Sequence, residues 1–187
     1  APQQKPVDIP VVKTTVQDVD LKKEFVGNVY GMVDIPIRAR VEGFLEGIHF
    51  NEGRRVKKGQ LLYTIDAQPF QASVAESQSK LAEAQVALVK AENDLKRIQP
   101  LADINAVSKA DLDAAIAQRD AAEANVQAAK AGVQISNINL GYTEIKSPID
   151  GLIGKTVAKV GEFVGRSPNP VILNTVSQID TIRVDFY

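Results

Sequence analysis

Cysteine and tryptophan are absent from this 187-residue chain, which has a single histidine and a single methionine. Without cysteine there are no disulfide bonds and no thiol chemistry. One histidine also leaves too few ligands for a zinc site of the usual kind. We therefore expect no metal and no other cofactor.

Two further absences narrow the class of protein. No apolar run approaches the roughly 20 residues that a membrane-spanning helix needs. The formal net charge is -1, so the chain lacks the excess of positive charge that attracts nucleic acid. The carboxylates show no spacing suited to acid–base catalysis, and nothing activates a nucleophile. These features indicate a binding or structural protein with no catalytic residues, rather than an enzyme.

Glycine is missing from the whole stretch between Gln60 and Ala131, where Ala, Glu, Gln, Lys and Leu dominate. These residues favour helix. Pro69 suits a first helical turn, and Pro100 disfavours helical backbone at the residue before it. We predict one helix over 69–99 and a second over 109–140, joined by a turn.

Both helices carry an apolar position at every seventh residue, with alanine or serine between, as in the seam of a coiled coil. A fold-back about residues 101–108 then predicts four layers: Leu95 with Leu112, Leu88 with Arg119, Leu81 with Val126, and Val74 with Val133. Arg119 is the one charged seam position. We expect its aliphatic stem to pack in the seam while its guanidinium reaches water or a carboxylate.

An internal repeat flanks the helical stretch. Gly43, Gly53 and Val56 recur with one constant offset as Gly151, Gly161 and Val164. An internal repeat is given more weight than other sequence signals, because the whole fold is predicted wrongly if the repeat is missed. The four glycines mark the tight turns of two β half-motifs: Gly43, Gly53, Gly151 and Gly161.

Alternating apolar residues predict strands elsewhere, including a strand or two in 11–27 and one in 181–187 that lacks a partner in the sequence. We expect an α+β chain in which one β module is split by the helical hairpin. The predicted order is a lead-in with the first strand or strands of a β-barrel, a first half-motif, the hairpin with its tip at about 100–108, a second half-motif, and a returning barrel strand that is cut short. The corresponding ranges are 1–32, 33–67, 68–141, 142–177 and 178–187.

The two half-motifs resemble a biotinyl/lipoyl carrier domain, with a hairpin inserted at the turn that would bear the modified lysine. This arrangement resembles the periplasmic adaptors, or membrane fusion proteins of the HlyD/RND type, of Gram-negative tripartite multidrug efflux pumps. The resemblance covers nearly the whole chain. The run 147–151 resembles the family's second half-motif, and 179–186 resembles a returning strand of its β-barrel.

The hairpin tip carries a sharper match. Adaptors that meet TolC-like outer-membrane channels have an Arg, a Leu four residues later and a Ser seven after that; here these are Arg97, Leu101 and Ser108. Each also has a structural explanation. Ser108 with Asp111 is an N-cap pattern, Arg97 suits a helix C-terminus, and Leu101 could close the end of the coiled coil.

The resemblance implies a non-enzymatic adaptor that docks a TolC-like channel through its tip. Its other partner would be an inner-membrane RND-type transporter, and several copies would associate into a ring. The protein would lie in the periplasm, with peripheral or lipid-anchored attachment to the inner membrane through residues before Ala1. Three alternatives stay open: an adaptor for an ABC-type exporter, a scaffold with no channel partner, and a biotin or lipoyl carrier subunit, which needs a lysine at the turn between the half-motifs.

Overall fold

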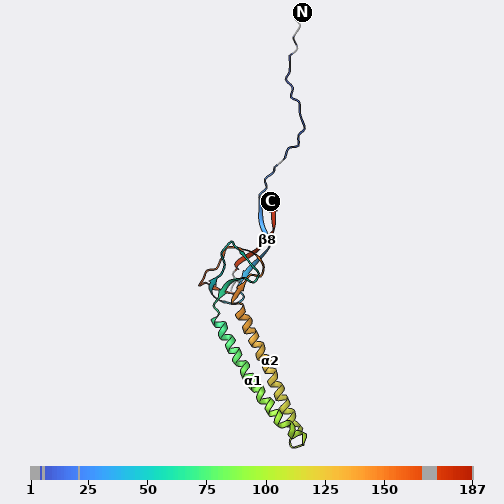
Figure 1. The fold of residues 1–187 in the computed structure, drawn as a ribbon, viewed down its shortest axis with the longest axis vertical. Helices are drawn as coiled ribbons and strands as arrows, with labels where there is room; N and C mark the ends of the chain where they lie inside the picture. Colours follow the sequence, from blue (N-terminus) through green and yellow to red (C-terminus); the bar gives the residue numbers. More distant parts are fainter. Residues whose placement is uncertain (1–4, 6, 21, 166–171, 187) are drawn as a thin grey trace.

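The protein consists of an extended N-terminal segment, a β module and a long helical hairpin, shown by a computed structural model (Figure 1). The structure describes residues 5, 7–20, 22–165 and 172–186. The strands are β1 (Gly27–Arg38), β2 (Gly43–Ile48), β3 (Arg55–Val56), β4 (Leu61–Ile65), β5 (Glu144–Lys146), β6 (Gly151–Ile153), β7 (Phe163–Val164) and β8 (Ile172–Phe186). The helices are α1 (Gln68–Asp103) and α2 (Lys109–Gly141).

The β module contains two four-stranded sheets whose strands come from both copies of the repeat. One sheet has the order β1-β8-β6-β3, and the other has the order β5-β4-β2-β7. Strand β2 pairs with β7, so that Gly43 faces Val164, while β3 pairs with β6, so that Val56 faces Gly151. Each half-motif therefore completes the sheet of the other, and neither half can fold alone into the observed structure.

The hydrogen bonds repeat with the same two-fold pattern. The amide of Leu45 donates to Glu162 O at 2.9 Å, and its carbonyl accepts from Gly161 N at 2.7 Å. The equivalent Ile153 donates to Arg54 O at 3.0 Å and accepts from Gly53 N at 3.0 Å. Gly53 and Gly161 have φ of +68° and +87°, a region that favours glycine. The sequence repeat is thus an internal symmetry of the backbone.

One apolar core lies between the two sheets, and a buried polar network runs through it. Tyr63 of the first half-motif is fully buried, and its hydroxyl lies 2.7 Å from Thr156 Oγ1. Asn174 Nδ2 donates to the same hydroxyl at 3.3 Å and to Gly154 O at 3.1 Å. Burial raises the pKa of Tyr63, whereas the hydrogen bonds with Thr156 and Asn174 partly oppose that rise. The network ties the two half-motifs together.

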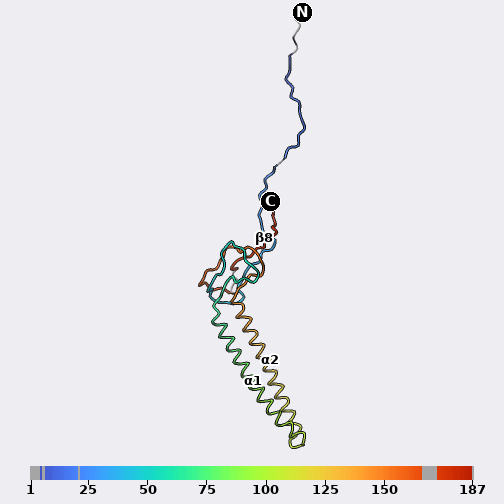
Figure 2. The backbone as a smooth tube through the Cα atoms, viewed as in Figure 1, coloured from blue at the N-terminus to red at the C-terminus, as the bar shows by residue number. Residues whose placement is uncertain are grey.

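The hairpin enters where a carrier domain would have a tight turn. Strands β4 and β5 pair in antiparallel fashion, and Ile65 N donates to Thr143 O at 2.9 Å just beside the two helices. The two helices leave the module side by side from this point (Figures 1 and 2). No lysine-bearing tight turn stands there, so the carrier alternative loses its structural basis. The predicted fold class, a split lipoyl-like β domain with an inserted antiparallel hairpin, is confirmed.

Strands β1 and β8 form a long antiparallel pair that continues away from the hairpin (Figure 2). Their register shifts between Gly31 and Val33, next to the expected domain boundary at 32/33. The prediction that the closing stretch lacks a partner is wrong, because Gly27 faces Phe186 and Gly31 faces Ile182. The strand predicted within 11–27 is also wrong, because the first strand of the structure begins only at Gly27. The described residues there have no neighbouring strand to accept their backbone hydrogen bonds, and their side chains are exposed.

Candidate functional site at the hairpin tip

The first helix ends four residues later than the sequence predicted. Pro100 lies inside α1, which continues to Asp103. A proline removes one amide donor and disfavours helical backbone before it, but near an exposed helix end this cost did not stop the last turn from forming. The true stop is Asn105, whose φ of 57° is left-handed. Asparagine is one of the few residues that tolerate this conformation, so it was the signal that the sequence analysis missed.

Hydrogen bonds close the end of α1 firmly. Asn105 N donates to Ala102 O at 2.9 Å, and Ala106 N donates to Leu101 O at 2.8 Å. These are the two bonds of a Schellman motif, which satisfies the otherwise unpaired carbonyls at a helix end. The carbonyl of Leu101 is therefore held by the turn, which fixes the backbone from which its side chain projects.

A capping box begins α2. Ser108 is the N-cap, and its Oγ accepts from Asp111 N at 3.1 Å. The Asp111 carboxylate in turn accepts from Ser108 N at 3.2 Å and from Ser108 Oγ at 2.7 Å. The reciprocal bonds satisfy donors at the helix start and place the negative charge where the helix dipole favours it. The proton of the Ser108 hydroxyl is thus used within the tip, and one lone pair of this exposed oxygen is left to accept a further hydrogen bond.

Arg97 and Leu101 are four residues apart and lie on one face of the last turns of α1, while Ser108 begins α2 on the other side of the turn. The side chain of Arg97 is 77% exposed and pairs with Asp94 of its own helix. Leu101 is 42% exposed, and the neighbouring Ile104 is 72% exposed. The three predicted residues thus lie within one short segment of chain, with two apolar side chains uncovered at the far end of the hairpin.

A groove of about 530 Å³ opens beside Arg97 between the two helices. It combines small side chains with the charges of Arg97 and two aspartates. Its lining residues are Ala91, Asp94, Arg97, Ile98, Val107, Asp111, Ala114, Ala115 and Gln118. The alanines leave room in the seam close to the tip.

The predicted seam residues lie between the helices. Val74 and Val126 are buried, and the other five are half-buried: Leu81, Leu88, Leu95, Leu112 and Val133. The predicted pairing of layers is wrong, however, because Ser77 Oγ lies 2.8 Å from Ser136 Oγ. That contact moves the register by about one heptad and sets Leu88 level with Val126. The later end of α1 accounts for this shift, because it moves the centre of the fold-back from between residues 103 and 104 to between residues 106 and 107 and so slides α2 along α1.

Arg119 consequently faces a different layer from the one predicted. It lines a groove of about 280 Å³ together with Leu95, not Leu88. Its guanidinium lies 3.1 Å from Asp120 Oδ1 and 3.4 Å from Glu123 Oε2, both on α2. Its Nε is buried without a hydrogen-bond partner in the described part of the chain. The stem packs and the head reaches carboxylates, but the seam retains one unsatisfied donor.

The described residues contain no cluster of three or more His, Cys, Asp or Glu side chains placed to hold a metal ion. Nor does any described helix combine the length and apolar character that a membrane crossing requires. The candidate site is the exposed tip, where two sets of hydrogen bonds hold the turn and leave Leu101 and Ile104 uncovered.

A split β sandwich that carries an exposed hairpin defines an adaptor-type module of membrane fusion proteins. Residues 33–175 match the family model described as "RND MFP, barrel-sandwich hybrid domain". The chain belongs to this family, whose members are adaptors and not enzymes.

Curated relatives share about a third of their aligned residues with the chain. The multidrug resistance protein MdtA of Pantoea ananatis is 35% identical over 83% of this chain and 38% of its own length. The efflux pump periplasmic linker BepF of Brucella suis is 37% identical over 100% of this chain and 46% of its own. The chain therefore spans less than half the length of these relatives.

Solved structures show the same fold. A MacA–MexA chimeric protein containing the α-hairpin domain of Pseudomonas aeruginosa MexA is 29% identical, with a TM-score of 0.65 over 84% of this chain and 52% of its own. MacA from Actinobacillus actinomycetemcomitans is 28% identical, with a TM-score of 0.63 over 84% of this chain and 53% of its own.

Proposed function

We propose that this chain is the hairpin-bearing part of a periplasmic efflux adaptor. It would link an inner-membrane RND-type drug transporter to a TolC-like outer-membrane channel, and it would dock the channel through Arg97, Leu101 and Ser108. The observation that carries the proposal is the tip itself. Leu101 is exposed at the end of a hairpin whose turn is fixed by the Schellman bonds and the capping box.

The chemistry of the tip suits a helical partner. Leu101 would fill an apolar groove on the channel, and burying the exposed 42% of this residue supplies on the order of 1 kcal/mol. Arg97 would donate to carbonyls at the channel's helical turns, leaving or sharing Asp94. Ser108 would contribute its hydroxyl while it continues to cap α2.

One tip offers little area, so a single hairpin would bind weakly. We propose that several copies associate side by side into a ring, because linked sites bind at a high effective concentration. The parent protein would lie in the periplasm and attach to the inner membrane by a peripheral or lipid-anchored segment.

The family description names RND proteins, which favours an RND-type transporter. An adaptor for an ABC-type exporter is the second candidate, because the tip residues would serve it equally well.

Leu101→Asp tests the tip. We expect the variant to fold normally, since the side chain is 42% exposed, and to lose channel binding, since a carboxylate would be buried in an apolar groove. Co-purification of the channel with the adaptor measures docking. Val86→Asp is the matched control, because Val86 is 71% exposed on α1 away from the tip. Normal recovery of the channel with Leu101→Asp would contradict the tip model.

A further inference from the structure

An exposed aromatic pair lies on the β module, far from the hairpin tip. Phe44 of β2 faces Phe163 of β7, and their ring centroids lie 5.3 Å apart in an edge-to-face arrangement. The two side chains are 56% and 54% exposed. Val157 and Val160, which precede β7, are also exposed. We call these four residues the aromatic patch, since the two valines lie within six residues of Phe163 along the chain; an exposed apolar segment beside an exposed aromatic pair marks a candidate contact site.

The internal repeat supplies a control for this observation. The residues that correspond to Phe44 and Phe163 in the other half-motif are Leu152 and Arg55, and they form the same cross-strand pair. There Arg55 is exposed and lies 3.8 Å from Asp180. Because the same turn forms with Leu and Arg, the fold does not require two phenylalanines. The aromatic pair therefore calls for an explanation outside the fold.

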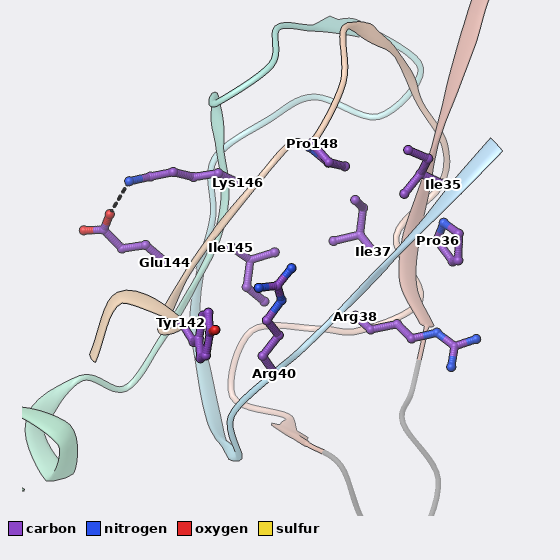
Figure 3. A pocket seen from close by; sticks show the side chains of 10 residues that line it. All are labelled: Ile35, Pro36, Ile37, Arg38, Arg40, Tyr142, Glu144, Ile145, Lys146 and Pro148. Carbon is purple, nitrogen blue, oxygen red and sulfur yellow. Dashed lines mark ion pairs between the residues drawn. The ribbon is translucent and has the colours of Figure 1, made fainter. Parts of the chain in front are cut away.

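A groove of about 470 Å³ lies between strands β1 and β5 (Figure 3). Ile37 and Ile145 are buried at its floor, and Pro148 lies at one side. Arg40 points towards the middle of the groove, and its guanidinium lies 5.0 Å from the ring centroid of Tyr142. Both β1 and β5 are edge strands of their sheets. We call this space the edge groove; it is apolar with a cationic centre.

The patch and the groove lie at opposite edges of the module. In the sheet β5-β4-β2-β7, the groove borders β5 and the patch covers β2 and β7. Neighbouring strands are about 4.8 Å apart, so roughly 14 Å separates the two edges. The aromatic pair and the floor of the groove can therefore both be open on one copy, with the short segment from Arg40 to Phe44 running between them.

The charges of the two surfaces are complementary. Glu144 also lines the groove but pairs with Lys146, and Lys155 and Lys159 lie beside the two valines of the patch. Next to the aromatic pair itself, Glu42 and Glu46 lie within two residues of Phe44, whereas Arg38 and Arg40 border the groove. None of these four has an ion-pair partner among the described residues. An acidic, aromatic patch would attract a basic, apolar groove. Two patches, or two grooves, would repel each other through their like charges.

We propose that the aromatic patch of one copy docks in the edge groove of a second copy. This proposal rests on the copy-to-copy association proposed above and names its surfaces. A phenyl ring would lie against the Arg40 guanidinium, which already packs on Tyr142, and Glu42 would approach Arg38. The contact uses two different surfaces, so it leads to a ring or an open chain and not to a two-fold dimer.

The absence of cysteine makes the contact testable by cross-linking. One tagged batch of the chain carries Val160→Cys in the patch, and a second, differently tagged batch carries Lys146→Cys beside the groove. After mixing at high concentration with a short bis-maleimide, we expect a product that joins the two tags. Links within either batch alone, or no link at all, would overturn the proposal.

Two variants sharpen the test. Phe163→Arg introduces the residue that the other half-motif carries at the equivalent place, so the fold should tolerate it while the mixed product falls at least fivefold. Arg55→Phe is its control and should leave the product unchanged. Leu101→Asp should also leave the product unchanged, because no channel is present. The mixed product therefore reports the patch contact alone, and channel co-purification reports tip docking alone.

Discussion

At the scale of single residues, Ser108 carries two roles that the structure allows to be separated. Its hydroxyl caps α2, and Ser→Ala at an N-cap costs about 0.5–2 kcal/mol. Asparagine caps about as well as serine. We expect Ser108→Ala to lower both hairpin stability and channel docking, and Ser108→Asn to lower docking alone. Thermal unfolding followed by helical circular dichroism, beside channel co-purification, measures the two effects. Full docking by both variants would reduce Ser108 to a helix cap.

Tyr63 is the residue on which the joining of the two half-motifs depends most. Its pKa is raised by burial, so the folded protein prefers the neutral phenol. The stability from this group is complete below the unfolded pKa of about 10 and is lost as the pH rises through and above that value. Tyr63→Phe removes this loss, and at neutral pH it costs about 1–3 kcal/mol by leaving Asn174 and Thr156 short of a partner.

Denaturant unfolding at pH 7 and pH 11 measures both effects of Tyr63→Phe. We expect the variant to be less stable than the parent at pH 7 and to lose less stability than the parent between the two values. Lysines and other tyrosines titrate in both proteins, so the difference between proteins isolates Tyr63. Equal losses would show that this phenol contributes nothing to the alkaline transition.

At the scale of elements, the register of the hairpin is decided by its turn. Shifting the end of α1 from Gln99 to Asp103 moves every layer of the seam, although the seam residues themselves stay between the helices. Periodicity therefore predicted which residues face inward. It could not predict their partners, because these depend on where α1 ends. Pro100 suggested an end at Gln99, but a proline only disfavours helical backbone at the residue before it and does not forbid a further turn. The residue that marks the end of α1 is Asn105, which adopts the left-handed backbone conformation found after many helices.

Engineered disulfides in this cysteine-free chain test the register. We expect Ser77→Cys with Ser136→Cys to form an intrachain bond on mild oxidation, because the two hydroxyl oxygens lie 2.8 Å apart. Ser77→Cys with Ala129→Cys, the partner that the sequence pairing implies, should stay reduced. Mobility on non-reducing gels reads both. A bond in the second pair and not in the first would restore the sequence register.

At the scale of the whole molecule, the repeat predicted the fold because its glycines mark the same turns in both halves. Two features had no such signal. The pairing of β1 with β8 joins segments at opposite ends of the chain, and the network of Tyr63, Thr156 and Asn174 depends on tertiary contacts. The tip residues could be named from their spacing. Their surroundings, the Schellman bonds and the pairing of Arg97 with Asp94, needed the structure.

The elongated shape sets the function that the whole molecule can serve. Helix α1 has 36 residues and spans about 54 Å at 1.5 Å per residue, which carries the tip far from the β module. The β module and the tip lie at opposite ends of the hairpin (Figure 1). The lateral association and the end-on docking that we propose would therefore use separate surfaces.

Site-specific cross-linking from the tip tests the central claim most directly. A photo-reactive residue replaces Lys109, the first residue of α2, in cells that produce the protein and an outer-membrane channel. The account predicts an adduct with the channel that disappears when Arg97, Leu101 and Ser108 are replaced together. A well-produced, folded protein that forms no channel adduct, or an adduct that survives those replacements, would contradict it.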